Sequence, residues 1–167
     1  MFRSGSALSA GVALSVIIAC GGPPPRTANP TRPLDERRAI ELIIEAFRDE
    51  HDRPVPGTDV SVGANKKLHV DVSAQDRKYG VAYVSGPERW SLAGALPPRD
   101  PNMGDALPIV PGQGDDSDAR VLILYDSDYV YDDHVGEAHE QSTLATELRL
   151  KRDVHDFLVH AHTEKFP

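Results

Sequence analysis

The chain is nearly free of cysteine: Cys20 is the only one in 167 residues. No disulfide can form within the chain, and the folded part has no catalytic thiol. Basic residues are also in deficit, with 18 Lys and Arg against 26 Asp and Glu, for a formal net charge of −8. Such an acidic surface repels phosphate groups, so we expect no nucleic-acid partner and no broad polybasic contact with anionic lipid.

Common catalytic signatures are missing as well. The sequence has no Gly-x-Ser-x-Gly elbow of a serine hydrolase, no phosphate-binding P-loop and no Gly-x-Gly-x-x-Gly dinucleotide fingerprint. It also has no internal repeat. The patterns that are present indicate a small α+β domain without naming its molecular activity.

The first twenty residues have the layout of a secretory signal peptide. Arg3 supplies a positive charge, and an uncharged, mostly apolar run follows over 7–19. That run is shorter than the roughly 20 residues that a membrane-spanning helix needs. A charged start, an apolar run and a small residue at its end predict export and cleavage.

A cysteine stands directly after the predicted cleavage point, in Ile17-Ile18-Ala19-Cys20. This segment resembles the lipobox of bacterial lipoprotein precursors. The resemblance implies cleavage before Cys20, a diacylglyceryl group on its sulfur and acylation of its new amine. It therefore implies attachment to a membrane of the bacterial cell envelope through this lipid. Gly21, where Asp would favour the inner membrane, favours the outer membrane by the same resemblance.

Residues 1–19 are thus the predicted signal peptide, and residues 20–33 are the lipidated cysteine with a proline-rich tether. Five of the thirteen residues over 21–33 are Pro, which disfavours helices and strand ladders and favours extended polyproline II. We expect residues 34–167 to form a single α+β domain beyond this tether.

Hydrophobic periodicity predicts the elements of that domain. A first helix is expected over 34–51, because apolar residues recur there at helical spacing: Ile40, Ile43, Ile44 and Phe47. A last helix is expected over 136–162, with a wide apolar side that covers about half its circumference: Leu144, Leu148, Leu150, Val154, Phe157, Leu158 and Ala161.

Strands are expected between the helices: at 58–62, through Leu68, Val70 and Val72, at 79–84 and at 121–125. The runs at 79–84 and 121–125 are apolar on both faces, which is typical of strands in the centre of a sheet. The predicted fold class is α+β with two layers. A small antiparallel or mixed sheet of three to four strands is covered by the N-terminal and the long C-terminal helix.

A long loop is expected over 86–119, because this stretch contains six Pro and five Gly. Trp90, Leu92 and Leu96 are expected to hold its first part against the core. Asn102 to Ser117 is expected to be exposed and mobile.

Acidic residues after the strand at 121–125 form one candidate site. Carboxylates that converge beyond a central strand can bind a divalent cation, so we weigh a metal site of Asp126, Asp128, Asp132 and His134. The alternative is that these aspartates only form turns or cap a helix. His134 and His139 are five residues apart, which matches neither of the common zinc motifs.

A second candidate lies on the apolar side of the last helix, where Glu147, Lys151 and His155 project among hydrophobic residues. They could line a polar pocket between helix and sheet, or they could lie at the edge of the apolar side as ordinary ion pairs. We expect a non-enzymatic, lipid-anchored domain that binds an envelope protein or a wall component. The alternative is a metal-binding domain or metal-dependent hydrolase that uses the 126–134 loop. No cofactor is expected.

Overall fold

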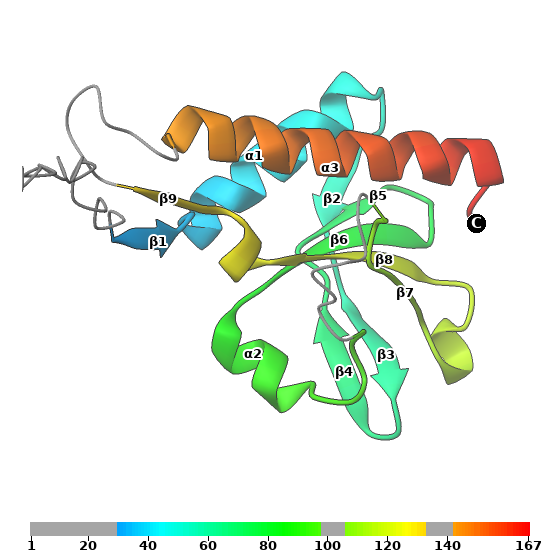
Figure 1. Ribbon diagram of the computed structural model, residues 1–167. Helices are drawn as coiled ribbons and strands as arrows, with labels where there is room; N and C mark the ends of the chain where they lie inside the picture. The colour runs from blue at the N-terminus through cyan, green and yellow to red at the C-terminus, as the bar shows by residue number, and fades with distance from the viewer. Residues whose placement is uncertain (1–29, 98–105, 133–141) are drawn as a thin grey trace, which may run out of the picture.

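The computed structural model describes residues 30–97, 106–132 and 142–167. The predicted signal peptide, Cys20 and most of the predicted tether lie outside these residues. The described chain is of the α+β class, as predicted (Figure 1). Its principal sheet has five strands rather than three or four, and two small two-stranded sheets accompany it.

The first helix, α1 (Glu36–Asp49), confirms the prediction from hydrophobic spacing. Asp35 caps it, because the aspartate side chain accepts a hydrogen bond from the Arg38 amide at 3.3 Å. Its buried face consists of Ala39, Leu42, Ile43, Ala46 and Phe47. Ile40 and Ile44 are only partly buried at the edge of this face.

The principal sheet has the order β2-β5-β6-β8-β7. Its strands are β2 (Pro54–Pro56), β5 (Val72–Ala74), β6 (Tyr79–Val84), β8 (Arg120–Tyr125) and β7 (Ile109–Pro111). β6 and β8 pair in parallel, and every other neighbouring pair is antiparallel. The two runs predicted to be central are β6 and β8, and burial on both faces explains why they lack polar positions.

The predicted strand through Leu68, Val70 and Val72 is two strands in different sheets. β4 (Lys66–His69) pairs with β3 (Asp59–Gly63) in a separate hairpin, whereas β5 joins the principal sheet. The chain bends between them at Val70 and Asp71. Gly80 of β6 lies under this bend, where a Cβ atom would stand 2.6 Å from Val70 Cγ1. The glycine therefore permits a close approach that no other residue would allow without a shift.

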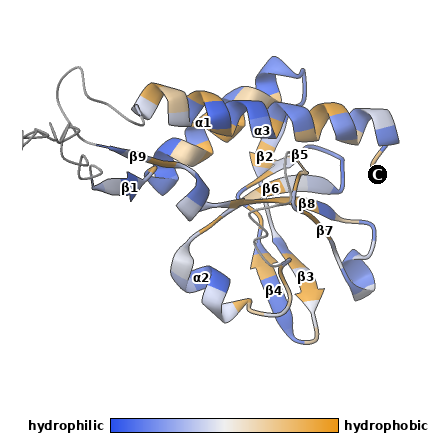
Figure 2. Cartoon of the chain, viewed as in Figure 1, coloured by the Kyte–Doolittle hydropathy of each residue, from blue (hydrophilic) through white to orange (hydrophobic). Residues whose placement is uncertain are grey.

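Alternate residues of β6 and β8 enter two hydrophobic clusters, one on each face of the sheet. Tyr79, Val81 and Tyr83 join α1 and the C-terminal helix in the first cluster. Ala82 and Val84 join residues of β3, β4 and β7 in the second. The two-layer prediction thus misses the β3–β4 hairpin, which covers the face away from the helices (Figure 2). Both clusters are built from residues between 34 and 166 of the described chain.

The segment 86–119 contains regular structure that its composition did not predict. α2 (Gly86–Ser91) and a 3-10 turn, η1 (Gly114–Asp116), flank β7. Trp90 was expected to pack on the core but is 82% exposed, whereas Leu92 is buried. The expected exposure of 102–117 is wrong at Val110, which is 5% exposed in β7; residues 98–105 lie outside the described part.

The tether ends earlier than predicted. β1 (Thr31–Pro33) pairs antiparallel with β9 (Val130–Asp132), which follows the 3-10 turn η2 (Asp126–Asp128). The proline-rich composition did not exclude this ladder, because only three residues pair and Pro33 stands at the strand's end.

The C-terminal helix, α3 (Thr143–Glu164), is capped by Ser142, whose hydroxyl accepts from the Ala145 amide. The predicted residues Leu150, Val154, Phe157, Leu158 and Ala161 are buried. Leu144 and Leu148 were expected on the same side but are 66% and 59% exposed. Among the described residues, no helix is both long and apolar enough to cross a bilayer.

Phe47 gives a direct test of the helix–sheet core. Its side chain is fully buried in the first cluster, so Phe47→Ala should lower the free energy of unfolding by about 3–5 kcal/mol. Urea denaturation followed by circular dichroism measures this loss. Leu148→Ala on the exposed face of α3 is the matched control and should change stability by less than about 0.5 kcal/mol. Equal midpoints for Phe47→Ala and the wild type would contradict the observed packing.

Candidate binding pocket at the carboxyl ends of β6 and β8

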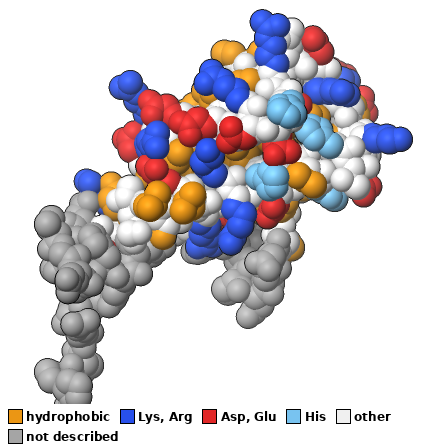
Figure 3. Space-filling model, turned by 90° about the horizontal axis from the view of Figure 1, so that it is seen from above, with side chains coloured by type: hydrophobic (Ala, Val, Ile, Leu, Met, Phe, Trp, Pro, Cys, Tyr) orange, Lys and Arg blue, Asp and Glu red, His pale blue; other side chains and the backbone are white. Residues whose placement is uncertain are grey.

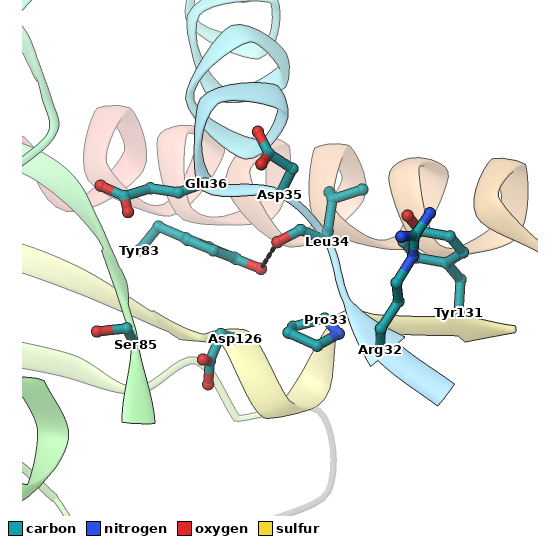
Figure 4. Close-up of a pocket in the computed structure, with 9 residues that line it drawn as sticks. All are labelled: Arg32, Pro33, Leu34, Asp35, Glu36, Tyr83, Ser85, Asp126 and Tyr131. Carbon is teal, nitrogen blue, oxygen red and sulfur yellow. Dashed lines mark hydrogen bonds between the residues drawn. The ribbon is translucent and has the colours of Figure 1, made fainter. Parts of the chain in front are cut away.

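The parallel strands β6 and β8 end side by side, with Val84 opposite Tyr125. Ser85 and Asp126 therefore leave the sheet at the same edge, where they line a pocket of about 600 Å³ (Figure 4). The carboxyl ends of parallel strands are a common location for binding sites, because the chain diverges there and leaves a crevice.

The other wall of the pocket comes from the N-terminal part of the described chain and from β9. Arg32 and Pro33 of β1, the residues 34–36 that lead into α1, and Tyr131 of β9 line it. Two hydrogen bonds fix this wall: the Leu34 amide donates to the Tyr129 carbonyl at 2.8 Å, and the Tyr83 hydroxyl donates to the Leu34 carbonyl at 2.9 Å. The Arg32 guanidinium lies 5.0 Å from the centre of the Tyr131 ring.

Three polar groups at the pocket, those of Asp35, Tyr83 and Asp126, already make structural hydrogen bonds. Asp35 caps α1, and Asp126 Oδ2 accepts from the Gly86 amide at 3.1 Å. Burial, followed by the nearby charges of Asp126, Asp35 and Glu36, raises the pKa of Tyr83. The Tyr83 hydroxyl therefore stays protonated at neutral pH and continues to donate to Leu34.

Two further carboxyl groups, those of Asp71 and of Glu88 in α2, are partly buried. Asp71 Oδ2 accepts from the Tyr83 amide at 2.7 Å. Burial raises the pKa of both Asp71 and Glu88, and the charge of Asp71 raises that of Glu88 further. His69, at the end of β4, has a raised pKa chiefly because Asp59 accepts its hydrogen bond at 2.9 Å.

The predicted metal ligands are only partly brought together. Asp126 lines the pocket, Asp128 lies in η2, and Asp132 is buried on β9 opposite Thr31; His134 lies outside the described residues. Within 30–97, 106–132 and 142–167, no three His, Cys, Asp or Glu residues form a group suited to a metal ion. The four-residue metal site therefore stays a prediction.

The residues weighed for a polar pocket under α3, Glu147, Lys151 and His155, each pair with α1 or its C-terminal end, in line with the ion-pair alternative. The Arg38 guanidinium binds Glu147 with two hydrogen bonds of 2.8 and 2.9 Å. Lys151 Nζ lies 3.2 Å from Asp49, and His155 Nδ1 lies 2.7 Å from Glu50. Apart from Thr146, the buried positions of α3 are apolar. Figure 3 shows acidic, basic and histidine side chains close together on the face seen from above.

These interhelical pairs also shift the pKa values of the residues that form them. Arg38 lowers the pKa of Glu147, and the Asp49 carboxylate raises that of Lys151. Glu147 and Lys151 do not pair with each other as their spacing suggested, since each has a partner on α1. Exposed ion pairs contribute little stability individually, whereas the bidentate and part-buried Arg38–Glu147 pair has the geometry to link the two helices.

Sequence reasoning identified only Asp126 among the residues that line the pocket. The remainder are Arg32, Pro33, Leu34, Asp35, Glu36, Tyr83, Ser85 and Tyr131. A usable signal was present: two fully apolar strands suggest a parallel pair, and the residues just after them, Ser85 and Asp126, would then meet at one edge.

Comparison with known proteins gives no match: no family model, no curated protein and no solved structure is significantly similar to this chain.

The raised pKa of Asp71 leads to a prediction about pH. A carboxyl whose pKa rises on folding favours the folded state when protonated, and this contribution is lost as the pH rises through the folded pKa. Asp71→Asn should therefore stabilise the protein at pH 7, and its advantage over the wild type should shrink as the pH falls from neutral toward 3.8. Thermal denaturation at a series of pH values measures both effects.

Asp71→Ala is the matched control for this experiment. It removes the acceptor of the Tyr83 amide, which Asn retains, and should destabilise the protein at every pH. If Asn destabilised the protein at pH 7 as much as Ala does, the carboxylate charge would be required there and the prediction would be wrong.

Proposed function

We propose that this protein is a lipid-anchored lipoprotein of the bacterial cell envelope, whose domain binds an envelope protein or a wall component at the pocket beside β1. The observation that carries the proposal is the order of features along the chain. The lipobox-like segment ends at Cys20, and only eleven residues later β1 begins to form the pocket wall. Two or more acyl chains on Cys20 would hold such a protein stably on a membrane.

The short connection supports a partner that lies close to the membrane. Eleven Cα–Cα steps from Cys20 to Thr31 span at most about 40 Å when fully extended. The pocket therefore stays within a few nanometres of the anchoring lipid. Gly21, in place of the Asp that would favour the inner membrane, makes the outer membrane the proposed location.

The chemistry of the pocket favours binding over catalysis. Asp35 and Asp126 accept structural hydrogen bonds, and the Tyr83 hydroxyl is committed to the Leu34 carbonyl. A general base must be able to take a proton from a substrate, and a tyrosine with a raised pKa that already donates internally is poorly suited to this role. Pro33, Leu34 and Tyr131 instead offer apolar and aromatic contact area.

Lipid attachment is tested first. Cys20→Ala removes the sulfur that would carry the diacylglyceryl group, so cells fed a clickable fatty acid should label the wild type and not the variant. The variant should also accumulate as uncleaved precursor. Ser15→Ala in the same leader is the control and should be labelled like the wild type. Equal labelling of Cys20→Ala and wild type would rule out the lipoprotein assignment.

Binding at the pocket is tested by site-specific photo-crosslinking in intact cells. Ser85 is suitable for replacement by a photoreactive amino acid, because its side chain makes no capping hydrogen bond to α2. We expect one dominant crosslinked species from position 85 and none from Thr163, which is exposed near the far end of α3. The same products from both positions, or none from position 85, would show that the pocket is not the binding surface.

A further inference from the structure

We propose that the outward face of the first turns of α3 docks onto the lipid surface that holds Cys20, with Leu144 and Leu148 as the side chains that enter it. The inference rests on the proposed lipid attachment at Cys20. It adds a second contact with the membrane, made by the folded domain itself. The contact would fix how the pocket is presented above the bilayer.

The apolar residues of this face lie outside the buried side of α3. Leu150, Val154 and Phe157 point into the core, while Leu144 and Leu148, one turn apart, are 66% and 59% exposed. Of the four large hydrophobic side chains exposed in the described chain, three are on α3: Leu144, Leu148 and Val159. Leu144 and Leu148 thus form a short apolar stripe outside the buried side of α3, which ends one turn later at the exposed Arg152.

The position of the stripe points to lipid as its occupant. The Thr146 hydroxyl donates to the Val130 carbonyl at 2.8 Å, which fastens the start of α3 to β9. β9 pairs with β1, and Thr31 stands opposite Asp132 where the chain arrives from Cys20. Figure 1 shows the start of α3, β9 and β1 together at one end of the molecule, away from the C-terminus. A connection of at most about 40 Å keeps this end near the anchor.

The charges around the stripe are compatible with contact at a bilayer surface. Glu147 and Lys151, which flank Leu148, are paired with Arg38 and with Asp49 of α1. The exposed Arg152, one turn after Leu148, is paired with Asp153, so none of the three needs a partner from the lipid. Because the chain is acidic overall, headgroup charge would not attract it, and the contact must be apolar.

Two leucines are too few to hold a free protein on a membrane. A short tether changes this balance, because it makes docking an intramolecular step with a high effective concentration. The contact is therefore expected only in the anchored protein, which gives the experiment a built-in comparison between the coupled and the free chain.

The test uses tryptophan fluorescence, since Trp90 is the only tryptophan and is exposed. In a Trp90→Phe background, Leu148→Trp places the reporter in the stripe, and Val159→Trp places a matched control further along α3. The chain from Cys20 to Pro167, which contains both hydrophobic clusters, is coupled through its single thiol to a maleimide lipid. The vesicles are mainly phosphatidylethanolamine with a minority of phosphatidylglycerol, and their acyl chains are either plain or brominated.

We expect the emission of the tryptophan at position 148 to shift to shorter wavelength and to be quenched by brominated lipid. Both effects should occur only in the lipid-coupled chain, and high salt should not reduce them. Position 159 should remain unquenched. Leu144→Ser should reduce the ratio of docked to undocked protein on the order of tenfold. Circular dichroism verifies that each variant is folded.

Three results would overturn the proposal: no quenching at 148, equal quenching at 159, or quenching that disappears in high salt. A spectral shift at 148 that grows with protein density without bromine quenching would assign the stripe to a second copy of the chain. Chemical coupling bypasses lipidation in the cell, so a failure of docking here is distinct from a failure of Cys20 to become labelled.

Discussion

The parallel pairing of β6 with β8 is the constraint on which the other features depend. Their six-residue register runs from Tyr79 opposite Arg120 to Val84 opposite Tyr125. Every residue of β6 is buried, so both faces of the sheet must be covered. The helices α1 and α3 cover one face and the β3–β4 hairpin covers the other. Because the two strands run the same way, their carboxyl ends also open at one edge and create the pocket.

Tyr83 connects this sheet edge to the rest of the domain. Its amide donates to Asp71 at the bend between β4 and β5, and its hydroxyl donates to the Leu34 carbonyl just before α1. One buried residue thus joins the hairpin, the central strand and the start of the first helix. The raised pKa of its hydroxyl keeps the second bond intact at neutral pH, so the pocket wall is held independently of modest changes in acidity.

The sequence predicted those parts of the fold that are encoded locally. Helical spacing located α1 and the buried residues of α3, and continuous apolar runs located β6 and β8. It did not predict β1, because this strand pairs with β9, where Thr31 lies opposite Asp132, about a hundred positions away. Pairing between such distant segments leaves no pattern in the local sequence. The pocket was missed for the same reason: its residues come from separate segments, and only Asp126 stood out as a carboxylate after an apolar strand.

The predicted apolar side of α3 is wider than the side that the structure buries. A helix that packs on one layer needs an apolar stripe of roughly 100°, whereas the predicted side covered about half the circumference. Leu144 and Leu148 account for the excess, and the structure places both outside the core. Periodicity alone cannot separate a leucine that faces a sheet from one that faces another apolar surface, because both obey the same helical spacing.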